Sequence, residues 1–354
     1  MSIEKLQQKA LHLLQQLIET PSFSGEEDKT ALLIEAWLHQ FDIETNRTKN
    51  NIWATNKYFD EKKPTVLLNS HHDTVKPNKA YANNPFEAEI KDGKLFGLGS
   101  NDAGGCLVSL LSLFVYYYKQ ENLKYNLIIA ASAEEESSGP NGLNSLLAEL
   151  PSIDFAVVGE PTQMQLAVAE KGLLVIDAYA PGVAGHAAHE NTDNAIYNAL
   201  EDILWIKNYE FPKISETLGK VKMNVTQINA GEQHNVVPAT CHFVIDVRIT
   251  DMYSNKEVFN FLQDNTKSEL KARSFRLNSS SIPVDHPIVK AGIELGRTTY
   301  GSPTLSDQAV LICPSLKLGP GDSTRSHSAN EFIYVEEVKE GISLYVEIFS
   351  KILL

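Results

Sequence analysis

Cysteine is scarce in this chain, and its placement excludes the usual cysteine-based sites. Cys106, Cys241 and Cys313 are the only three among 354 residues, and each stands among apolar or small neighbours. A thiolate zinc site and a disulfide framework both need cysteines at paired spacings, which are absent here. We therefore expect all three to be small core residues.

Long apolar runs are also missing. The longest, residues 106–118, is interrupted by Ser109 and Ser112 and is shorter than the roughly 20 residues that cross a bilayer, so it predicts a buried helix. Residues 1–20 predict an amphipathic helix and lack the basic, apolar and cleavage regions of a signal peptide. We expect a cytoplasmic protein with no membrane partner.

Basic residues are in deficit, with 31 Lys and Arg against 45 Asp and Glu and a net charge of −14. Nucleic acids and anionic membranes are bound through clustered Lys and Arg, so neither is an expected partner. Part of the acidity could instead lie in a metal site.

What the chain does contain is a set of short apolar strands that end in polar residues. Residues 65–69, 126–131, 155–158 and 315–318 predict strands, followed respectively by His71-His72-Asp73, Glu134-Glu135-Glu136, Gly159-Glu160-Pro161 and GPGDSTRSH. In open α/β sheets, ligands bind beyond the carboxyl ends of the strands. The sequence therefore predicts an α/β fold with a single crevice at one sheet edge.

The middle of the chain has a different pattern, and the length alone favours two domains. Strands are predicted at 173–180, 222–229, 241–249 and 274–278, with helices at 194–208 and 255–265. This βαββαβ order is typical of a ferredoxin-like α+β unit. We expect a discontinuous catalytic domain, 1–171 and 279–354, with an inserted domain at 172–278.

Several of the polar residues suit a metal, although each has a simpler interpretation. His71 with Asp73 matches a metal-binding imidazole oriented by a carboxylate, but a histidine at a strand end is often only structural. Asp102, in GLGSNDAGG, could cap the apolar helix that follows it. A dinucleotide loop is disfavoured there, because no suitable strand precedes the motif and Asp102 replaces its third glycine.

The triple glutamate at 134–136 is the most unusual feature. Three adjacent carboxylates repel one another unless a cation is present, although a solvated turn would also tolerate them. With Glu160 and His327 at other strand ends, the set offers the nitrogen and oxygen ligands that zinc accepts. Taken together, these positions favour a metal site.

The chain resembles a known family in seven motifs between Ser70 and Glu331: SHHDTVKP, GLGSNDAGG, EEESSG, VGEPT, GVAGHAA, NVVP and GPGDSTRSHSANE. They stand in the order found in the family of acetylornithine deacetylase, succinyl-diaminopimelate desuccinylase and glutamate-releasing carboxypeptidases. The resemblance implies a zinc-peptidase-like mixed-sheet catalytic domain with an inserted ferredoxin-like dimerisation domain, and hence a homodimer.

The resemblance also implies a role for each site residue. Two Zn²⁺ ions per chain, which Co²⁺ could replace, would be held by His71 and Glu160, by Glu136 and His327, and by a bridging Asp102. Asp73 would orient His71, and Glu135 would be the general base. A slip of one residue in the alignment would instead make Glu134 the base. His72 matches no ligand and is expected to line the entrance.

Three further residues carry implied roles in the middle of the chain. His186 would reach the partner subunit's site and bind the developing oxyanion, or else it only stabilises its turn; His189 is a nearby alternative. Asn235 and Arg248 match positions that contact substrate. The planar fork of Arg248 suits an α-carboxylate, unless this strand residue simply faces solvent.

The implied activity is hydrolysis of the amide bond of a small N-acylated amino acid. The EEE, GEPT and LSDQA segments are most similar to acetylornithine deacetylases, which implies N-acetylornithine as substrate and a place in arginine biosynthesis. N-acetylcitrulline, N-succinyl amino acids and exopeptidase activity remain alternatives. A non-catalytic metal-binding module is a further alternative, but such a module would not need an unliganded base such as Glu135.

Overall fold

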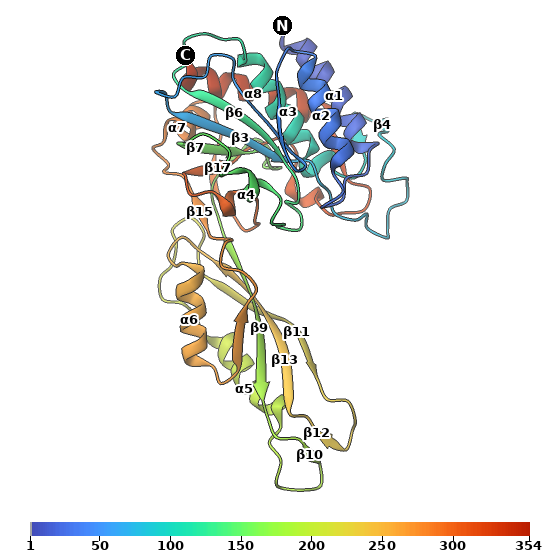
Figure 1. Ribbon diagram of the computed structural model, residues 1–354, viewed down its shortest axis with the longest axis vertical. Coiled ribbons are helices and arrows are strands. Elements are labelled where there is room, and N and C mark those ends of the chain that lie inside the picture. The colour runs from blue at the N-terminus through green and yellow to red at the C-terminus, as the bar shows by residue number, and fades with distance from the viewer. Residues whose placement is uncertain (1) are drawn as a thin grey trace. The chain divides into compact units, whose positions relative to one another are not determined.

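The computed structural model describes residues 2–354 and forms two compact units (Figure 1). One comprises Met1–Val168, Ser281–Tyr300 and Ser306–Leu354; the other comprises Ala169–Ser280 and Gly301–Leu305. The second unit is therefore inserted into the first. None of the described helices is long and apolar enough to span a membrane.

A nine-stranded mixed sheet organises the first unit, in the order β1-β2-β6-β3-β7-β17-β8-β15, with β16 paired to β8. The strands are β1 (Asn46–Thr48), β2 (Asn51–Thr55), β3 (Thr65–His71), β6 (Asn126–Ser132), β7 (Phe155–Val158), β8 (Leu166–Glu170), β15 (Ser280–Ser281), β16 (Thr299–Ser302) and β17 (Ser315–Lys317). β6, β3, β7 and β17 run parallel. Their carboxyl ends, and the four predicted polar segments, therefore share one sheet edge.

The central strands are apolar because both faces of the sheet are covered. Val66 and Leu68 of β3 pack into the cluster formed with the helices, whereas Leu67 packs with Leu143 and Leu146 of α4 on the other face. The helices in the first cluster are α1 (Ile3–Ile18), α2 (Asp28–His39), α3 (Gly105–Tyr117), α7 (Pro287–Glu294) and α8 (Val335–Leu353); α4 spans Leu143–Leu146. The arrangement is visible in Figure 1.

Helix α3 is the buried helix predicted from residues 106–118. Its two interrupting polar residues are accommodated within the helix, because the Ser109 hydroxyl donates to the carbonyl of Gly105 and the Ser112 hydroxyl donates to that of Val108, each over 2.7 Å. Of the cysteines, Cys106 and Cys241 are buried and Cys313 is half-buried, and all are unpaired. A small sheet of β4 (Ile90–Lys91), β5 (Lys94–Phe96) and β18 (Phe332–Tyr334) lies in the same unit.

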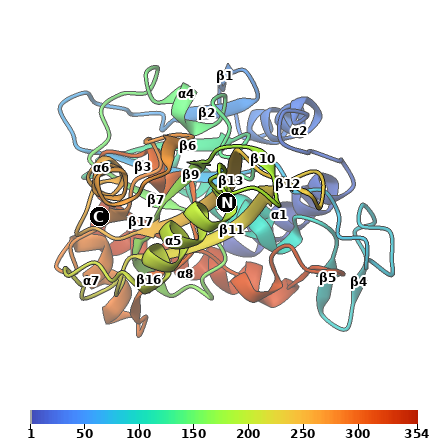
Figure 2. The same ribbon diagram turned by 90° about the horizontal axis from the view of Figure 1, so that it is seen from below.

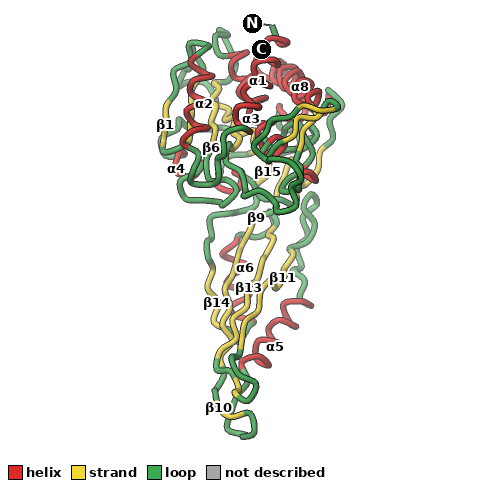
Figure 3. The backbone as a smooth tube through the Cα atoms, turned by 90° about the vertical axis from the view of Figure 1, so that its right-hand side faces the viewer, coloured by secondary structure: helices red, strands yellow, loops and turns green. Residues whose placement is uncertain are grey.

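The inserted unit has the predicted βαββαβ order: β9 (Gly172–Pro181), α5 (Ala195–Asn208), β11 (Lys222–Ala230), β13 (Thr240–Ile249), α6 (Asn255–Asn265) and β14 (Glu269–Ala272). The strands form an antiparallel sheet in the order β11-β13-β9-β14, seen side by side in Figure 3. Helix α5 packs against β11, β13 and β9 (Figure 2). A separate hairpin joins β10 (Gly185–His186) to β12 (Val236–Val237).

One strand prediction was wrong. The last strand of the inserted unit is Glu269–Ala272, and residues 274–278 are irregular. The earlier segment forms the ladder because Leu270 fills the core opposite Ala178 of β9. In the predicted segment, Phe275 is exposed, and the carbonyl of Leu277 accepts from the backbone N–H of Leu173 in β9 over 3.0 Å without the segment forming a strand.

Candidate metal centre

The centre is built around Asp102, in the short turn Ser100–Gly104 that leads into α3. Its Oδ1 lies 3.2 Å from Nε2 of His71, and its Oδ2 lies 3.6 Å from Nε2 of His327. The interpretation of Asp102 as a helix cap is wrong, because Gly104 occupies the N-cap position and no side chain caps the helix. The Asp102–Ala103 peptide bond is cis.

Two further carboxylates complete the cluster, one beside each histidine. Glu160 Oε1 lies 3.9 Å from Nε2 of His71, and Glu136 Oε2 lies 2.9 Å from Nε2 of His327. One ligand atom each of His71, Asp102 and Glu136 fall within 4.8 Å of one another. The structure thus brings together all five residues proposed as metal ligands, with Asp102 between two pairs.

Burial differs across the cluster. The side chain of His71 is 1% exposed and those of Glu136, Asp102 and Glu160 are 7%, 13% and 13% exposed, whereas that of His327 is 54% exposed. The centre is therefore accessible on the side of His327.

Asp73 does more than lie behind His71. Nδ1 of His71 lies 2.9 Å from the backbone carbonyl of Asp73 and 3.5 Å from its carboxylate. That carboxylate accepts hydrogen bonds from the Ser24 hydroxyl over 2.7 Å and from the backbone N–H groups of Glu135 and Glu136 over 3.0 and 3.1 Å. Asp73 therefore fixes both a histidine and the triple-glutamate turn.

The three glutamates have different surroundings. The Glu134 carboxylate is satisfied by Asn141, accepting from its backbone N–H over 3.0 Å and from its side-chain amide over 2.9 Å. Glu136 faces His327. No hydrogen bond reaches the Glu135 carboxylate from residues 2–354, although burial, Glu160 and Asp307 hold its pKa well above the usual range. Glu135, a half-buried residue, is thus the one of the three glutamates whose carboxylate no hydrogen bond engages within residues 2–354.

The electrostatics of the cluster are those of crowded carboxylates and histidines. Burial and the neighbouring Asp102 charge raise the pKa of Glu160 to about 8. The hydrogen bond to Glu136 raises the pKa of His327 to about 9. Burial opposes protonation of His71, but its hydrogen bonds to Asp102 and Asp73 prevail and raise its pKa. Bound protons thus balance part of the negative charge, as a divalent cation would.

His72 does not line an entrance, contrary to expectation. Its side chain is buried, with Nδ1 2.9 Å from the hydroxyl of Thr30 and Nε2 2.9 Å from the backbone carbonyl of Asn50. Burial lowers its pKa to about 4. With both ring nitrogens engaged, His72 joins neighbouring segments as a neutral side chain.

Within the inserted unit, two candidate residues meet at the hairpin. His186 is exposed and pairs with Val236, and the carbonyl of Asn235 accepts from the backbone N–H of Ala187 over 3.0 Å. His186 Nδ1 accepts from the backbone N–H of Ala188 over 3.1 Å, which leaves Nε2 free to face a ligand. His189 lies near it, with ring centroids 5.6 Å apart.

Arg248 lies elsewhere in the same unit. It pairs with Leu173 at the start of β9, whereas the hairpin follows the other end of that strand at Pro181, about 26 Å away at the usual rise per residue. The Arg248 guanidinium binds both oxygens of Asp246 over 2.9 and 3.1 Å, on the sheet face opposite the helices. One inserted unit therefore does not bring His186 and Arg248 together.

Comparison with known proteins assigns the chain to a family. The model of peptidase family M20/M25/M40 matches residues 67–351. This chain belongs to that family. Among curated relatives, acetylornithine deacetylase of Proteus mirabilis is 30% identical over 96% of both chains, and succinyl-diaminopimelate desuccinylase 2 of a Ruegeria species is 22% identical over 95% of this chain and 93% of the relative.

Solved structures show the same M20 fold. An M20 metallo-carboxypeptidase from Sulfolobus solfataricus superimposes with a TM-score of 0.76 at 17% identity, covering 97% of this chain and 99% of that one. A dinuclear metal-binding M20 peptidase from Bacillus subtilis gives 0.72 at 15% identity, covering 98% of each. The predicted fold class is confirmed.

The residues of this M20 chain fit a pair of divalent ions such as zinc. The donor set consists of imidazole nitrogens and carboxylate oxygens, which zinc prefers where thiolates are absent. Asp102 alone directs one oxygen at each histidine. Each half of the cluster then holds one histidine, one glutamate and one oxygen of Asp102, the arrangement that a shared carboxylate bridge requires.

Three further residues beside the ligands are buried, and no role was predicted for them from the sequence. Glu331 is 1% exposed and accepts a hydrogen bond from the backbone N–H of Asp102; burial, together with the neighbouring Asp102 charge, raises its pKa to about 8. Asn101 joins that turn to the His327 loop. Asp307 accepts from the Ser132 hydroxyl over 2.5 Å, and burial raises its pKa to about 6. All three lie within quoted motifs, which is the signal that could have found them: Asn101 in GLGSNDAGG, Glu331 in GPGDSTRSHSANE and Asp307 in LSDQA.

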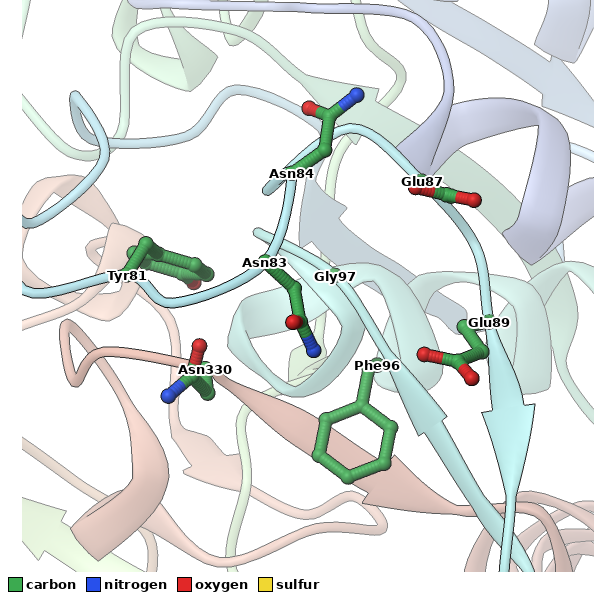
Figure 4. A pocket seen from close by; sticks show the side chains of 8 residues that line it. All are labelled: Tyr81, Asn83, Asn84, Glu87, Glu89, Phe96, Gly97 and Asn330. Atoms are coloured by element: carbon green, nitrogen blue, oxygen red, sulfur yellow. The ribbon is translucent and has the colours of Figure 1, made fainter.

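The structure also contains a separate cavity of about 140 Å³ (Figure 4). Asn83, Asn330, Phe96 and Gly97 border it, and Asn83 lies between Asn330 and Phe96 in this view. None of the five proposed ligands lines this cavity, so it is distinct from the candidate centre.

Proposed function

We propose that this protein is a metal-dependent amidohydrolase that removes the N-acyl group, acetyl in the first instance, from a small amino acid such as N-acetylornithine. The supporting observation is the 30% identity to acetylornithine deacetylase of Proteus mirabilis over 96% of both chains. This activity would belong to arginine biosynthesis in the cytoplasm. The clustered ligands supply the machinery for the reaction.

In this proposal His71 and Glu160 would hold one Zn²⁺, Glu136 and His327 would hold the other, and Asp102 would contribute to both. When bound, the ions would polarise the acyl carbonyl and lower the pKa of an attacking water. The Asp73 carbonyl, 2.9 Å from Nδ1 of His71, favours the tautomer whose Nε2 is free to bind metal. The buried Asp73 carboxylate then keeps Glu136 in place through its backbone.

Glu135 would act as the general base and later as the acid. It takes a proton from the attacking water and returns it to the amine leaving group, so the products are a carboxylate such as acetate and a free amino acid. Its position supports this role: it is half-buried beside the proposed ligands, and no hydrogen bond in the described chain occupies its carboxylate. Glu134 is engaged by Asn141 instead.

His186 would stabilise the oxyanion in the site of a partner subunit. Its exposure at the hairpin, distant along β9 from Arg248, supports a role outside its own inserted unit. Helix α5 offers a surface for the dimer, because Tyr197, Leu200 and Leu204 follow one helical face and are 67%, 43% and 55% exposed. In a two-fold dimer each subunit would supply the same groups to the other.

Asn235 and Arg248 would contact the amino acid part of the substrate. The Arg248 guanidinium already binds the carboxylate of Asp246 through two hydrogen bonds, from Nε and Nη2. On substrate binding, the substrate α-carboxylate would replace the Asp246 carboxylate as the partner of the Arg248 guanidinium. Asn235 lies beside His186 and so, like it, would make its contact from the partner subunit.

Other substrates of the same chemical class follow from the relatives. The succinyl-diaminopimelate desuccinylase relative supports an N-succinyl amino acid as the alternative, and N-acetylcitrulline is a further candidate. The structural neighbours include peptidases, which supports dipeptides as a third class.

A deacylation panel tests the proposal directly. Purified zinc-loaded protein is offered N-acetylornithine, N-acetylcitrulline, their N-succinyl analogues and two dipeptides, and release of the free amine is measured. The highest kcat/KM for N-acetylornithine would support the proposal. Preference for a succinylated or peptide substrate would change the proposed substrate but keep the proposed reaction, amide hydrolysis. If none of the compounds were hydrolysed, the proposed reaction itself would be refuted.

A further inference from the structure

Two of the proposed ligands, Asp102 and His327, lie in two different loops. Asp102 stands in the turn Ser100–Gly104, and His327 stands in the segment that ends at Glu331. Glu331 is 1% exposed, yet it is none of the five ligands, so its burial needs an explanation. A buried carboxylate is costly unless hydrogen bonds satisfy it.

The carboxylate of Glu331 is satisfied by the backbone of the Asp102 turn. Its Oε1 accepts from the N–H groups of Asn101 and Asp102, each over 2.9 Å, and its Oε2 accepts from the N–H of Gly99 over 3.2 Å. The backbone carbonyl of Glu331 also accepts from the N–H of Gly97 over 3.0 Å. Both carboxylate oxygens are therefore directed at the turn.

Asn101 ties the same two loops together in the opposite direction. Its side-chain oxygen accepts from the backbone N–H of Asp322 over 3.0 Å, and its amide donates to the carbonyl of Asp322 over 3.0 Å. The contact is close enough that a Cβ on Gly321 would lie 2.5 Å from the Asn101 oxygen. Each loop thus presents a side chain to the backbone of the other.

We propose that Glu331 is a positioning residue of the metal centre, which with Asn101 sets the spacing between Asp102 and His327 before any ion binds. The inference rests on the proposed function, because it takes Asp102 and His327 to be ligands. Loss of the carboxylate would leave three backbone N–H groups without acceptors and free the turn to move. This movement would weaken the binding of metal rather than the binding of substrate.

The test compares Glu331→Ala, Glu331→Gln and a matched control. Asp202 is also buried and accepts from the backbone N–H groups of Lys267 and Ser268, in the inserted unit, so Asp202→Ala removes a comparable carboxylate that touches no proposed ligand. The zinc dissociation constants of each metal-free protein are measured by competition with a chelating indicator. The Tm of each metal-free protein is recorded in parallel, with kcat and KM of the zinc-loaded form.

We expect Glu331→Ala to weaken zinc binding by about 10- to 100-fold and to lower kcat with less than about a twofold change in KM. Glu331→Gln keeps one acceptor oxygen and should recover part of the affinity. Asp202→Ala should lower Tm but leave zinc affinity unchanged. If Glu331→Ala does not fold, the zinc affinity of Glu331→Gln tests the inference instead, and we expect it to be several-fold weaker than that of the unaltered protein.

Wild-type zinc affinity in the Glu331 variants would overturn the inference, as would an equal loss of affinity in Asp202→Ala for the same fall in Tm. Failure of the proposed function is distinguishable from either, because the unaltered protein would then bind no zinc or release no amine from any acylated amino acid. In that case the inference falls with it.

Discussion

The backbone N–H of Glu135 donates to Oδ1 of Asp73 over 3.0 Å, and its neighbour Glu136 donates to Oδ2 of the same carboxylate over 3.1 Å. Replacing Asp73 by Asn puts an amide donor against one of these N–H groups. We expect Asp73→Asn to lower both zinc affinity and turnover by about 10- to 100-fold, as is usual for such outer partners. Zinc analysis with steady-state kinetics checks this, and unchanged values would contradict the role.

Glu135 should be needed for turnover but not for zinc binding. Glu135→Ala should keep its zinc but lose turnover by about 10² to 10⁴-fold, because it removes the proton carrier and no proposed ligand. Glu134→Ala is the matched control one residue away, because the Glu134 carboxylate accepts a hydrogen bond from the side-chain amide of Asn141. Elemental analysis and kcat are measured for both. If Glu134→Ala shows the large loss instead, the proton carrier has been assigned to the wrong glutamate.

Zinc binding should depend on pH. In the metal-free protein, the pKa values of His327 and Glu160 are raised to about 9 and about 8, so both carry protons at pH 7. Zinc must displace these protons, and its apparent affinity should therefore rise as pH rises from 6.5 to 8.5. The rise should be shallower in His327→Ala, measured by the same competition titration. An identical slope in both proteins would contradict the assignment.

A subunit-mixing experiment tests the trans role of His186. Inactive His186→Ala and inactive Glu135→Ala subunits are combined and allowed to exchange. A mixed dimer then contains one site with both groups intact, so activity should reappear in the mixture. The single His186 substitution should lower turnover by about 10² to 10³-fold with metal content unchanged. No recovery after verified exchange, or a fully active monomer, would exclude donation across the interface.

The strand ends could be predicted because the physics there is local. Continuous apolar runs mark the parallel strands, and His71, Glu136 and Glu160 follow them at once, so a shared sheet edge brings them together. The inserted unit was found by its alternating pattern. Its last strand was misplaced because Phe275 and Leu277 imitate that alternation, whereas register with β9 selected residues 269–272.

Other features depend on contacts between distant segments, which no local pattern encodes. Burial of His72 follows from Thr30 and Asn50, contributed by different parts of the chain. The role of Glu331 depends on backbone N–H groups some 230 residues earlier, which a sequence does not display. The distinction among the three glutamates likewise comes from Asn141 and Asp73 rather than from their own order.

A zinc titration of the metal-free protein with N-acetylornithine present, following release of ornithine, tests directly whether bound metal is needed for hydrolysis. We expect negligible release without zinc and full activity at close to two equivalents per chain, because five ligands with one shared carboxylate would accommodate two ions. Full activity in protein shown to contain no metal would contradict the proposed metal-dependent mechanism. The absence of activity on every N-acylated amino acid at every zinc concentration would contradict the proposed reaction.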